Sequence, residues 1–523
     1  MSKKNSKFSL PTVTLLAVIL TVIAEAVFAA LLLMLNLLPL EFTLLILLVL
    51  ALIPVLMLLS IRKGSKKPLR YIIIWLLTVL IVGGCVFGSI ALGKLHATLN
   101  AITSHKEDGN VYVGVYVSKD SPAAALKDTA GLTFGYTTEN TWSTAEALKA
   151  LDLQLGSTVD AREFDSAFAV ADALKSGEVG AALLNENTAE LMEEVEGYET
   201  FLSDTRLLHE IAVKEQQLPE IEEPEDPVED PVIDPEDPLV DPEEEPIEPP
   251  ATLNVSRDPF ILYLSGSDTR ASTLKKSRSD VNILAVVNPQ TQQILLINTP
   301  RDYYVTLGGT KDSKDKLTHA TMYSMKTAIR TMEKLYNCDI SYYARINFSG
   351  FEKMIDAIGG VDIYSDVKFI TDDDIWIYEG NNHLNGEAAL SFARERHHLK
   401  GGDNARGKNQ MKVIAAVVDK VTTGTTIITK YAEIMDSLGG MFTTDMPMEK
   451  ISELVQLQLT EMPKWEIYSY AVTGVGTYDY TYAMPNTKVY VMNPNTKTVK
   501  HAKSLMKKVL KNEVLTDADM TIS

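Results

Sequence analysis

The sequence predicts an α/β protein in which three transmembrane helices precede a small α/β accessory domain, an acidic linker and a larger C-terminal α/β domain. Two compositional features and one pattern lead to this order. The first hundred residues contain three long apolar runs, and residues 219–250 combine ten prolines with 15 acidic residues. After residue 251, short apolar runs alternate with segments of helical spacing, which is typical of α/β domains.

The distribution of charge gives the domain boundaries. The chain has 523 residues and a formal net charge of −20. Residues 1–100 carry +7, residues 101–218 carry −13, residues 219–250 carry −15 and residues 251–523 carry +1. We assign these segments to a membrane domain, an accessory domain, a linker and a C-terminal domain with its core at 251–425 and a continuation at 426–523. The acidic total argues against nucleic acid as a partner.

The apolar runs at 13–35, 42–61 and 71–92 each approach the ~20 residues that a helix needs to cross a bilayer. Basic residues mark the cytoplasmic side. They precede the first run and fill the loop between the second and third, at Lys3, Lys4, Lys7, Arg62, Lys63, Lys66, Lys67 and Arg70. We therefore expect a multi-pass protein of a bacterial cell membrane, with a cytoplasmic N-terminus and extracellular domains after about residue 95.

Two features of the spans bear on function and on compartment. Glu25 lies inside the first span, where a carboxyl group is costly. It is either a functional group or, as we favour, a protonated carboxyl bonded to a neighbouring helix. Of the two cysteines, Cys85 lies in an apolar run, so Cys338 has no partner for an intramolecular disulfide. An exported domain without disulfides fits a bacterial cell surface.

The middle of the chain predicts a globular domain followed by an extended spacer. Residues 111–117 alternate as a strand does, and 144–151 and 163–174 have helical spacing. No catalytic motif accompanies them, so we expect a partner-docking or spacer role. The linker at 219–250 cannot bury apolar surface, and its like charges and prolines favour an extended, disordered chain. A spacer role is favoured over ligand binding, and the two outer domains are expected to be loosely coupled.

The C-terminal segment predicts buried strands at 260–264, 281–287 and 293–298 and helices at 319–335, 351–358, 386–393 and 403–422, the last capped by Asp403. Charged residues follow these elements in two groups. The first is Asp268, Arg278, Asp280 and Arg301; the second is Arg394, Arg396, Asp403, Arg406 and Gln410. Residues 403, 406 and 410 share one helix face. Arginine forks suit phosphate, and paired aspartates beside them suit Mg²⁺, so the pattern predicts a magnesium–diphosphate site.

At these residues the sequence resembles the LytR-CpsA-Psr family of bacterial cell-wall enzymes. The resemblance covers 257–425 closely and continues more loosely to the C-terminus. It rests on SGSDTR at 265–270, RSD at 278–280, TPRD at 299–302, KLTHA at 316–320, GFEKMIDAIGGVD at 350–362, LNGEAAL at 384–390, RER at 394–396 and DNAR at 403–406 with Gln410. The three spans and the intervening domain are most similar to the capsule-associated, CpsA-type members.

The resemblance implies a fold, an activity and a set of roles. The fold is an α/β/α sandwich with a mixed central sheet and an apolar lipid pocket. The activity is a Mg²⁺-dependent phosphotransfer that moves a glycopolymer from a polyprenyl diphosphate carrier in the membrane lipid to peptidoglycan. The glycopolymer would be a capsular polysaccharide or a teichoic-acid-like polymer. Matching family positions assign metal binding to Asp268 and Asp280, diphosphate binding to Arg278, Arg301, Arg394 and Arg396, and further active-site roles to Asp403, Gln410 and, beside them, Arg406.

Several points stay open at this level. Lys316 is a weaker candidate for phosphate binding, and His319 is interpreted as a structural histidine. Asp403 or Asp302 is the candidate general base. Two alternatives compete with the ligase: a hydrolase that uses water at the same site, and a non-enzymatic membrane regulator of envelope genes. The chain departs from the family pattern at Asn409, where a basic residue is common, and in the two histidines that follow Arg396.

Overall fold

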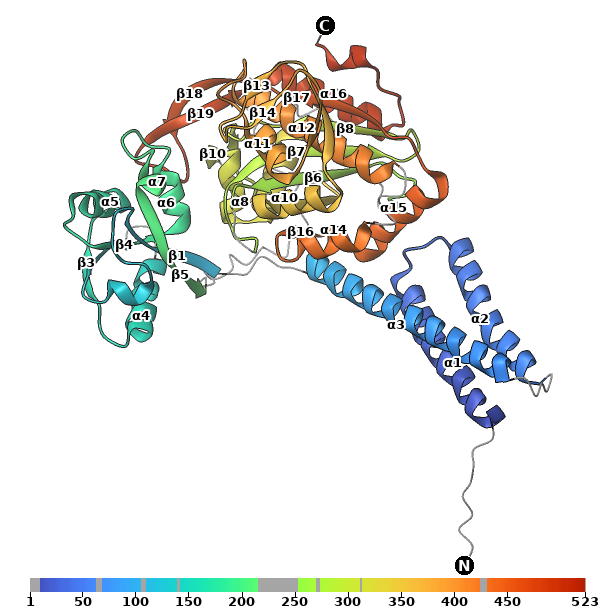
Figure 1. Cartoon of the computed structure of the whole chain (residues 1–523). Coiled ribbons are helices and arrows are strands. Elements are labelled where there is room, and N and C mark those ends of the chain that lie inside the picture. Colours follow the sequence, from blue (N-terminus) through green and yellow to red (C-terminus); the bar gives the residue numbers. More distant parts are fainter. Residues whose placement is uncertain are drawn as a thin grey trace, which may run out of the picture.

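A computed structural model of the chain describes residues 10–62, 68–104, 110–138, 142–214, 253–269, 273–310, 313–423 and 430–522. Figure 1 shows a three-helix arm, an accessory domain and a larger C-terminal domain, with the arm and the accessory domain on different sides of the larger one. The acidic linker predicted at 219–250 lies outside the described residues, so its extended state stays a prediction.

The arm contains three helices that are long and apolar enough to cross a membrane, as the sequence predicts. They are α1 (Leu10–Leu35), α2 (Leu40–Arg62) and α3 (Pro68–Ser104). The third helix continues well past residue 92, where the apolar run ends. Its extra turns are amphipathic, and Leu95, Leu99 and Ile102 pack with Leu35 and with Phe442 of the C-terminal domain. The arm is therefore fixed to the C-terminal domain by an apolar contact.

The accessory domain is a five-stranded sheet in the order β3-β2-β4-β1-β5, in which β2 runs parallel to its two neighbours. Its strands are β1 (Asn110–Ser118), β2 (Thr133–Tyr136), β3 (Asp160–Glu163), β4 (Ala181–Asn185) and β5 (Thr205–Lys214). Its helices are η1 (Leu126–Thr129), α4 (Trp142–Leu155), α5 (Ala167–Ser176), α6 (Glu186–Met192) and α7 (Phe201–Asp204). The helix predicted from 163 is wrong at its start, because Glu163 ends β3 and Ser166 caps α5 by accepting a hydrogen bond from Ala169 N.

The C-terminal domain is built on a mixed six-stranded sheet in the order β16-β11-β6-β7-β8-β17. Its strands are β6 (Phe260–Ser267), β7 (Ser279–Asn288), β8 (Gln293–Asn298), β11 (Tyr342–Asn347), β16 (Phe442–Thr444) and β17 (Glu466–Ala471). The three central strands are antiparallel, whereas β11 is parallel to β6 and β17 is parallel to β8. Alternate residues of β7 point to opposite faces, Leu284 to one core and Ile283 to another.

Helices cover both faces of this sheet, so the predicted α/β/α sandwich is confirmed (Figure 1). They are η2 (Leu317–His319), α8 (Ala320–Tyr323), α9 (Met325–Tyr336), α10 (Phe348–Ala357), α11 (Gly386–Arg394), α12 (Asp403–Thr422), α14 (Tyr431–Leu438), α15 (Met448–Glu461), α16 (Thr496–Leu510) and η3 (Asp517–Met520). The small paired strands are β9 (Tyr304–Thr306) with β10 (Lys314–Lys316), β12 (Val361–Ser365) with β15 (Gly380–Leu384), β13 (Phe369–Ile370) with β14 (Trp376–Ile377), and β18 (Gly474–Tyr480) with β19 (Lys488–Pro494).

Two helix predictions are corrected by local capping. The single helix predicted at 319–335 is broken at Ser324, whose extended backbone caps α9 and whose hydroxyl accepts a hydrogen bond from Thr327 N. Asp403 is not the cap of α12 but its first residue; Gly402, at φ 52°, takes the cap position. The carboxylate of Asp403 is therefore free to pair with Arg406 one turn further along.

Candidate functional site

The strand directions bring the first group of predicted site residues to one edge of the sheet. Asp268 follows the end of β6, and Asp280 lies at the start of the antiparallel β7. Arg301 follows β8, which is also antiparallel to β7. The ends of β6 and β8 and the beginning of β7 therefore meet at the same edge, and Asn347 at the end of the parallel β11 joins them there.

Two helices bring the second group to the same edge. Arg394 is the last residue of α11, and Arg396 follows it. Asp403, Arg406 and Gln410 lie on the first turns of α12. A side-chain carbon added at Gly407 would collide with the side chain of Asn298 at the end of β8, so glycine permits this close approach of helix and strand.

All ten residues that the sequence predicts for the site line one cavity of about 1000 Å³; they are Asp268, Arg278, Asp280, Arg301, Lys316, Arg394, Arg396, Asp403, Arg406 and Gln410. The rest of the wall is largely apolar and includes Leu264, Ala344, Ile346, Phe348, Phe351, Met354, Leu390, Val413, Ile414, Val417, Val418 and Phe442. Phe442 also packs against the end of α3. The cavity therefore joins a charged centre to an apolar region beside the membrane helices.

Ion pairs order the charged centre. Arg301 Nη1 donates to both carboxylate oxygens of Asp280, at 3.0 and 3.1 Å, and Arg278 Nη2 lies 3.2 Å from Asp268 Oδ2. Burial alone would raise the pKa of Asp280, but the cationic Arg301, Arg406 and Arg278 hold it well below its ordinary value. Asp280 is consequently a carboxylate at neutral pH, and it holds the guanidinium of Arg301 beside the cavity that both residues line.

The carboxylate charge of Asp268 is less well stabilised than that of Asp280. Burial and the nearby charge of Asp280 raise its pKa, and the pairing with Arg278 only partly offsets them. Within the described residues, its buried Oδ1 has no hydrogen-bond partner. An orphaned carboxylate oxygen beside a second carboxylate is the donor set that Mg²⁺ prefers, so these residues fit a divalent metal.

Arg394 differs from the inner arginines in its exposure. Its side chain is 45% exposed, lies over the ring of Phe348 at 4.9 Å, and comes no closer than 3.7 Å to Asp373 Oδ2. An arginine that stacks on an aromatic ring and is only weakly paired keeps its fork available for an anionic ligand. Arg394 thus stands at the mouth of the cavity, whereas Arg301 belongs to its floor.

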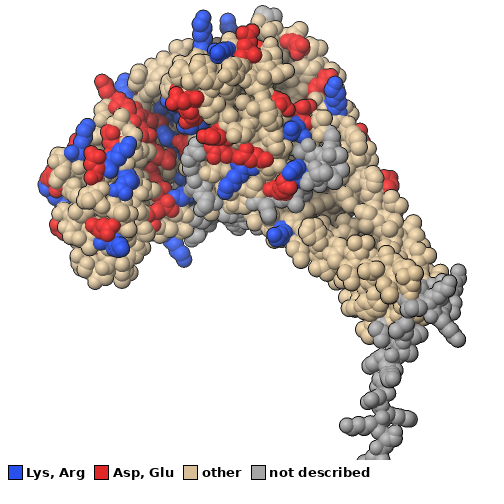
Figure 2. All heavy atoms as spheres, viewed as in Figure 1, with Lys and Arg blue, Asp and Glu red and all other residues tan. Residues whose placement is uncertain are grey.

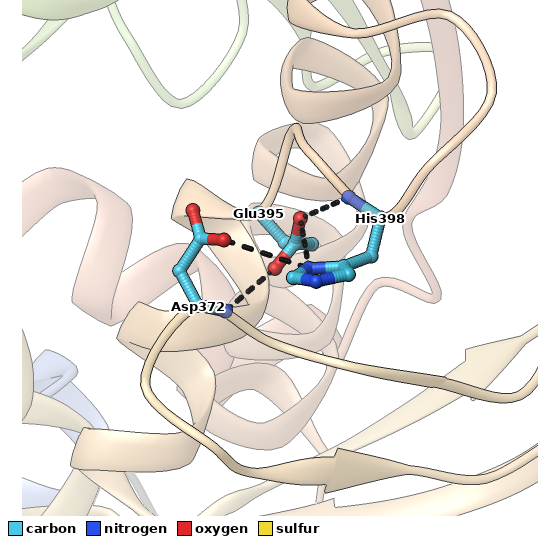
Figure 3. Close-up of side chains that lie close together, drawn as sticks. All are labelled: Asp372, Glu395 and His398. Atoms are coloured by element: carbon cyan, nitrogen blue, oxygen red, sulfur yellow. Dashed lines mark hydrogen bonds and ion pairs between the residues drawn. The ribbon is translucent and has the colours of Figure 1, made fainter.

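Glu395 lies between Arg394 and Arg396 and holds the loop that follows α11; Figure 3 shows its contacts with Asp372 and His398. The buried carboxylate of Glu395 accepts hydrogen bonds from His398 N and Asp372 N, both at 2.8 Å. The side chains of Asp372, Glu395 and His398 come close enough to hold a metal ion. Because both oxygens of Glu395 already accept backbone hydrogen bonds, we assign this cluster to positioning Arg394 and Arg396.

The accessory domain contributes to the same cavity, which the sequence does not predict. Glu194, just after α6, lies 2.9 Å from Lys316 Nζ and 3.2 Å from His319 Nε2. His319 is fully buried and its Nδ1 is 2.7 Å from Asp315 Oδ1, which agrees with a structural role. Burial alone would lower the pKa of His319, but Glu194 and Asp315 raise it to about 9.

Further carboxylates of the accessory domain face the C-terminal domain, and Figure 2 shows acidic side chains gathered along this boundary. Glu190 Oε2 lies 3.4 Å from Arg278 Nε, and Lys275 pairs with Glu186 and Glu210. Burial and the charge of Asp268 raise the pKa of Glu190 to about 8. The expectation that the outer domains are loosely coupled is therefore wrong: part of the negative charge of the accessory domain complements the cations of the site.

The similarity to known proteins lies in the C-terminal part of the chain. A profile of the LytR_cpsA_psr family matches residues 239–508. A polyisoprenyl-teichoic acid–peptidoglycan teichoic acid transferase, TagU, of Bacillus cereus is 33% identical over 198 residues, which are 38% of this chain and 64% of that protein. TagU of Enterococcus faecalis is 33% identical over 202 residues, 38% of this chain and 65% of that protein. The match thus spans just under two thirds of these relatives.

Among solved structures, that of TagV from B. subtilis is 26% identical, covers 50% of this chain and 99% of that chain, and has a TM-score of 0.41. The family profile covers more than half of the chain and contains every predicted site residue. With its three membrane helices and its mixed α/β/α domain, this chain belongs to the LytR-CpsA-Psr family.

Proposed function

We propose that the protein is a membrane-anchored phosphotransferase that moves a glycopolymer from a polyprenyl diphosphate carrier to peptidoglycan outside the cell. The observation that carries this proposal is one cavity in which an apolar region beside α3 leads to a cluster of arginines and aspartates. A polyprenyl diphosphate has the matching chemistry, a long apolar chain ending in a compact anion. The names of the TagU relatives give the same class of reaction for those proteins.

The topology supports delivery of a lipid substrate. The loop between α1 and α2 contacts α15 of the C-terminal domain, where the Gln456 side-chain amide donates to Asn36 O at 2.5 Å. That loop carries no basic residue, whereas the opposite ends of the helices are rich in them. By the positive-inside rule, the C-terminal domain then lies outside the membrane with its apolar cavity close to the bilayer surface.

The charged residues suit phosphoryl transfer, which requires positioning and charge neutralisation more than covalent help. Arg278, Arg301, Arg394 and Arg396 would bind the diphosphate oxygens, and Gln410 would donate a further hydrogen bond. Asp268 and Asp280 would hold Mg²⁺, which when bound supplies positive charge to the diphosphate. The polyprenyl monophosphate is the leaving group, and the new bond joins the distal phosphorus to a hydroxyl oxygen of muramic acid.

Asp302 and Asp403 are the two candidates for the base that accepts the hydroxyl proton. Asp302 Oδ1 lies 3.3 Å from Lys316 Nζ and its Oδ2 lies 3.6 Å from Arg301 Nε. Among the described residues, Asp403 forms an ion pair only with Arg406. Its side chain is one-fifth exposed and lines the cavity. We favour Asp403, because fewer cations compete for its carboxylate and a hydroxyl group can reach it.

The full-length protein in lipid nanodiscs tests this function. A polyprenyl diphosphate-linked oligosaccharide and soluble glycan strands of peptidoglycan are supplied with Mg²⁺, and both polyprenyl monophosphate and strand-linked oligosaccharide are measured. The proposal expects the two products in equal amounts. Polyprenyl monophosphate released equally with and without strands would establish the hydrolase, and no turnover of any lipid diphosphate would favour the non-enzymatic regulator.

A further inference from the structure

A hairpin of the C-terminal domain presents a row of exposed tyrosines beside the cavity. Strands β18 and β19 are antiparallel, and Tyr478 lies opposite Tyr490 while Tyr480 lies opposite Lys488. Residues directly opposite each other share one face of a hairpin. On this face Tyr478 is 66%, Tyr480 49% and Tyr490 38% exposed, so three large aromatic side chains lie together at the surface.

The row has a defined geometry. The rings of Tyr478 and Tyr490 are 6.0 Å apart and nearly perpendicular, and the ammonium group of Lys488 lies 5.3 Å from the centre of the Tyr480 ring. A side-chain carbon added at Gly476 would come within 2.7 Å of the Tyr490 ring, so this glycine lets the ring lie across the strand. Val491 on the other face is fully buried and fixes the hairpin to the domain.

Tyr490 connects this row with the reaction site. Its side chain lines the same cavity as Arg301 and Asp403, and burial, together with the charges of Asp302 and Asp403, raises its pKa. Tyr478 and Tyr480 continue the row outward along the hairpin. In Figure 1 the hairpin β18–β19 lies at the end of the C-terminal domain remote from the membrane helices. The row thus leads from the charged centre away from the membrane.

We propose that Tyr490, Tyr478 and Tyr480 form a platform that binds the sugar rings of the acceptor glycan strand; this inference rests on the proposed function. Aromatic rings offer a rigid apolar face to the C–H faces of sugars, and the ammonium group of Lys488 can bind their polar edges. The lipid donor enters from the apolar region beside α3. An acceptor that belongs to the wall must therefore approach from the far side, which is where the platform lies.

The test compares Tyr478→Ala/Tyr480→Ala with Tyr364→Ala, a matched variant in which an equally exposed tyrosine is removed from β12. Binding of soluble strands of alternating N-acetylglucosamine and N-acetylmuramic acid is measured by calorimetry on the full-length protein in nanodiscs. Strand transfer and binding of the lipid diphosphate donor are measured on the same samples. We expect the double variant to raise the Kd for strands and the acceptor KM about tenfold and to leave the Kd for the donor unchanged.

The outcomes separate the platform from the function. Unchanged strand affinity in the double variant overturns the platform, even if transfer by the wild type is normal. Loss of donor binding together with strand binding would mean that the hairpin is needed for folding. The single variants Tyr478→Phe and Tyr480→Phe then decide, since they must bind strands within about twofold of the wild type if the ring faces are what binds. A wild type that binds strands through the tyrosines but never transfers to them would leave the platform standing and overturn the proposed function.

Discussion

Arg301 and Arg394 are expected to respond differently to removal, although both line the cavity and both were predicted from the sequence as diphosphate ligands. The Arg301 and Asp280 side chains are only 20% and 15% exposed, and they are 3.0 Å apart. Arg301→Ala therefore leaves a largely buried carboxylate without its principal partner. Removal of one member of such a pair costs about 3 kcal/mol or more. Arg394→Ala removes a 45% exposed side chain and should change stability by about 0.5 kcal/mol or less.

The two variants are compared in thermal unfolding and in donor turnover by the full-length protein. For a domain of this size the Arg301→Ala cost corresponds to a melting temperature lowered by about 6–12 °C, whereas Arg394→Ala should shift it by no more than about 2 °C. Both should lower turnover about 10²–10³-fold, because each removes a donor to the transferring phosphate. Asp280→Asn combined with Arg301→Ala should recover part of the lost stability but none of the activity.

Two results would contradict the expected difference between Arg301 and Arg394. If Arg394→Ala destabilises the protein as much as Arg301→Ala, the distinction between an inner and an outer arginine is incorrect. If Asp280→Asn does not restore stability to Arg301→Ala, the cost does not come from the stranded carboxylate.

Three further predictions follow from other contacts. Glu194→Gln removes the pairing to Lys316 and His319 and should speed hydrogen exchange of the α6 amides, whereas Glu196→Gln, on the exposed part of the same segment, should not. The pKa of His319 is about 9 in the folded protein against about 6.5 in the unfolded chain. Protonated His319 therefore contributes up to about 3 kcal/mol to the free energy of unfolding below pH 6.5, and this contribution is lost as the pH rises toward 9. Unfolding measured across this pH range should show the loss in the wild type and not in His319→Gln. Gly407→Ala should cost about 1–3 kcal/mol and raise the donor KM, because α12 must move away from β8; unaltered melting and kinetics would contradict the close approach.

The sequence was sufficient for the features that depend on local pattern. The three spans are continuous apolar runs, and the strands that carry Asp268, Asp280 and Arg301 are short apolar segments ending in polar residues. The site residues lie at the ends of these strands, of β10 and of α11 or on the first turns of α12, so their grouping follows from the ends of a few elements. For this reason all ten predicted residues line one cavity.

What the sequence left unpredicted is mainly contact between distant segments. Glu194 and His319 are 125 residues apart in the chain, and no periodicity in either segment indicates that they meet. Two other differences between prediction and structure have a local signal in the sequence. The side chains of Leu95, Leu99 and Ile102 recur at helical spacing and indicate that α3 continues. A serine before a helical segment is a common cap, so Ser324 marks the break before α9.

We propose that the cavity transfers a phosphoryl-linked glycan from a lipid to the wall. The most direct test follows a polyprenyl diphosphate-linked oligosaccharide with a ³²P label in the distal phosphate, incubated with the full-length protein, Mg²⁺ and peptidoglycan strands. We predict that the label appears in a phosphodiester between the oligosaccharide and muramic acid and that Arg394→Ala prevents it. Label that stays with the polyprenyl phosphate, or that leaves only as an oligosaccharide phosphate formed with water, would contradict this function.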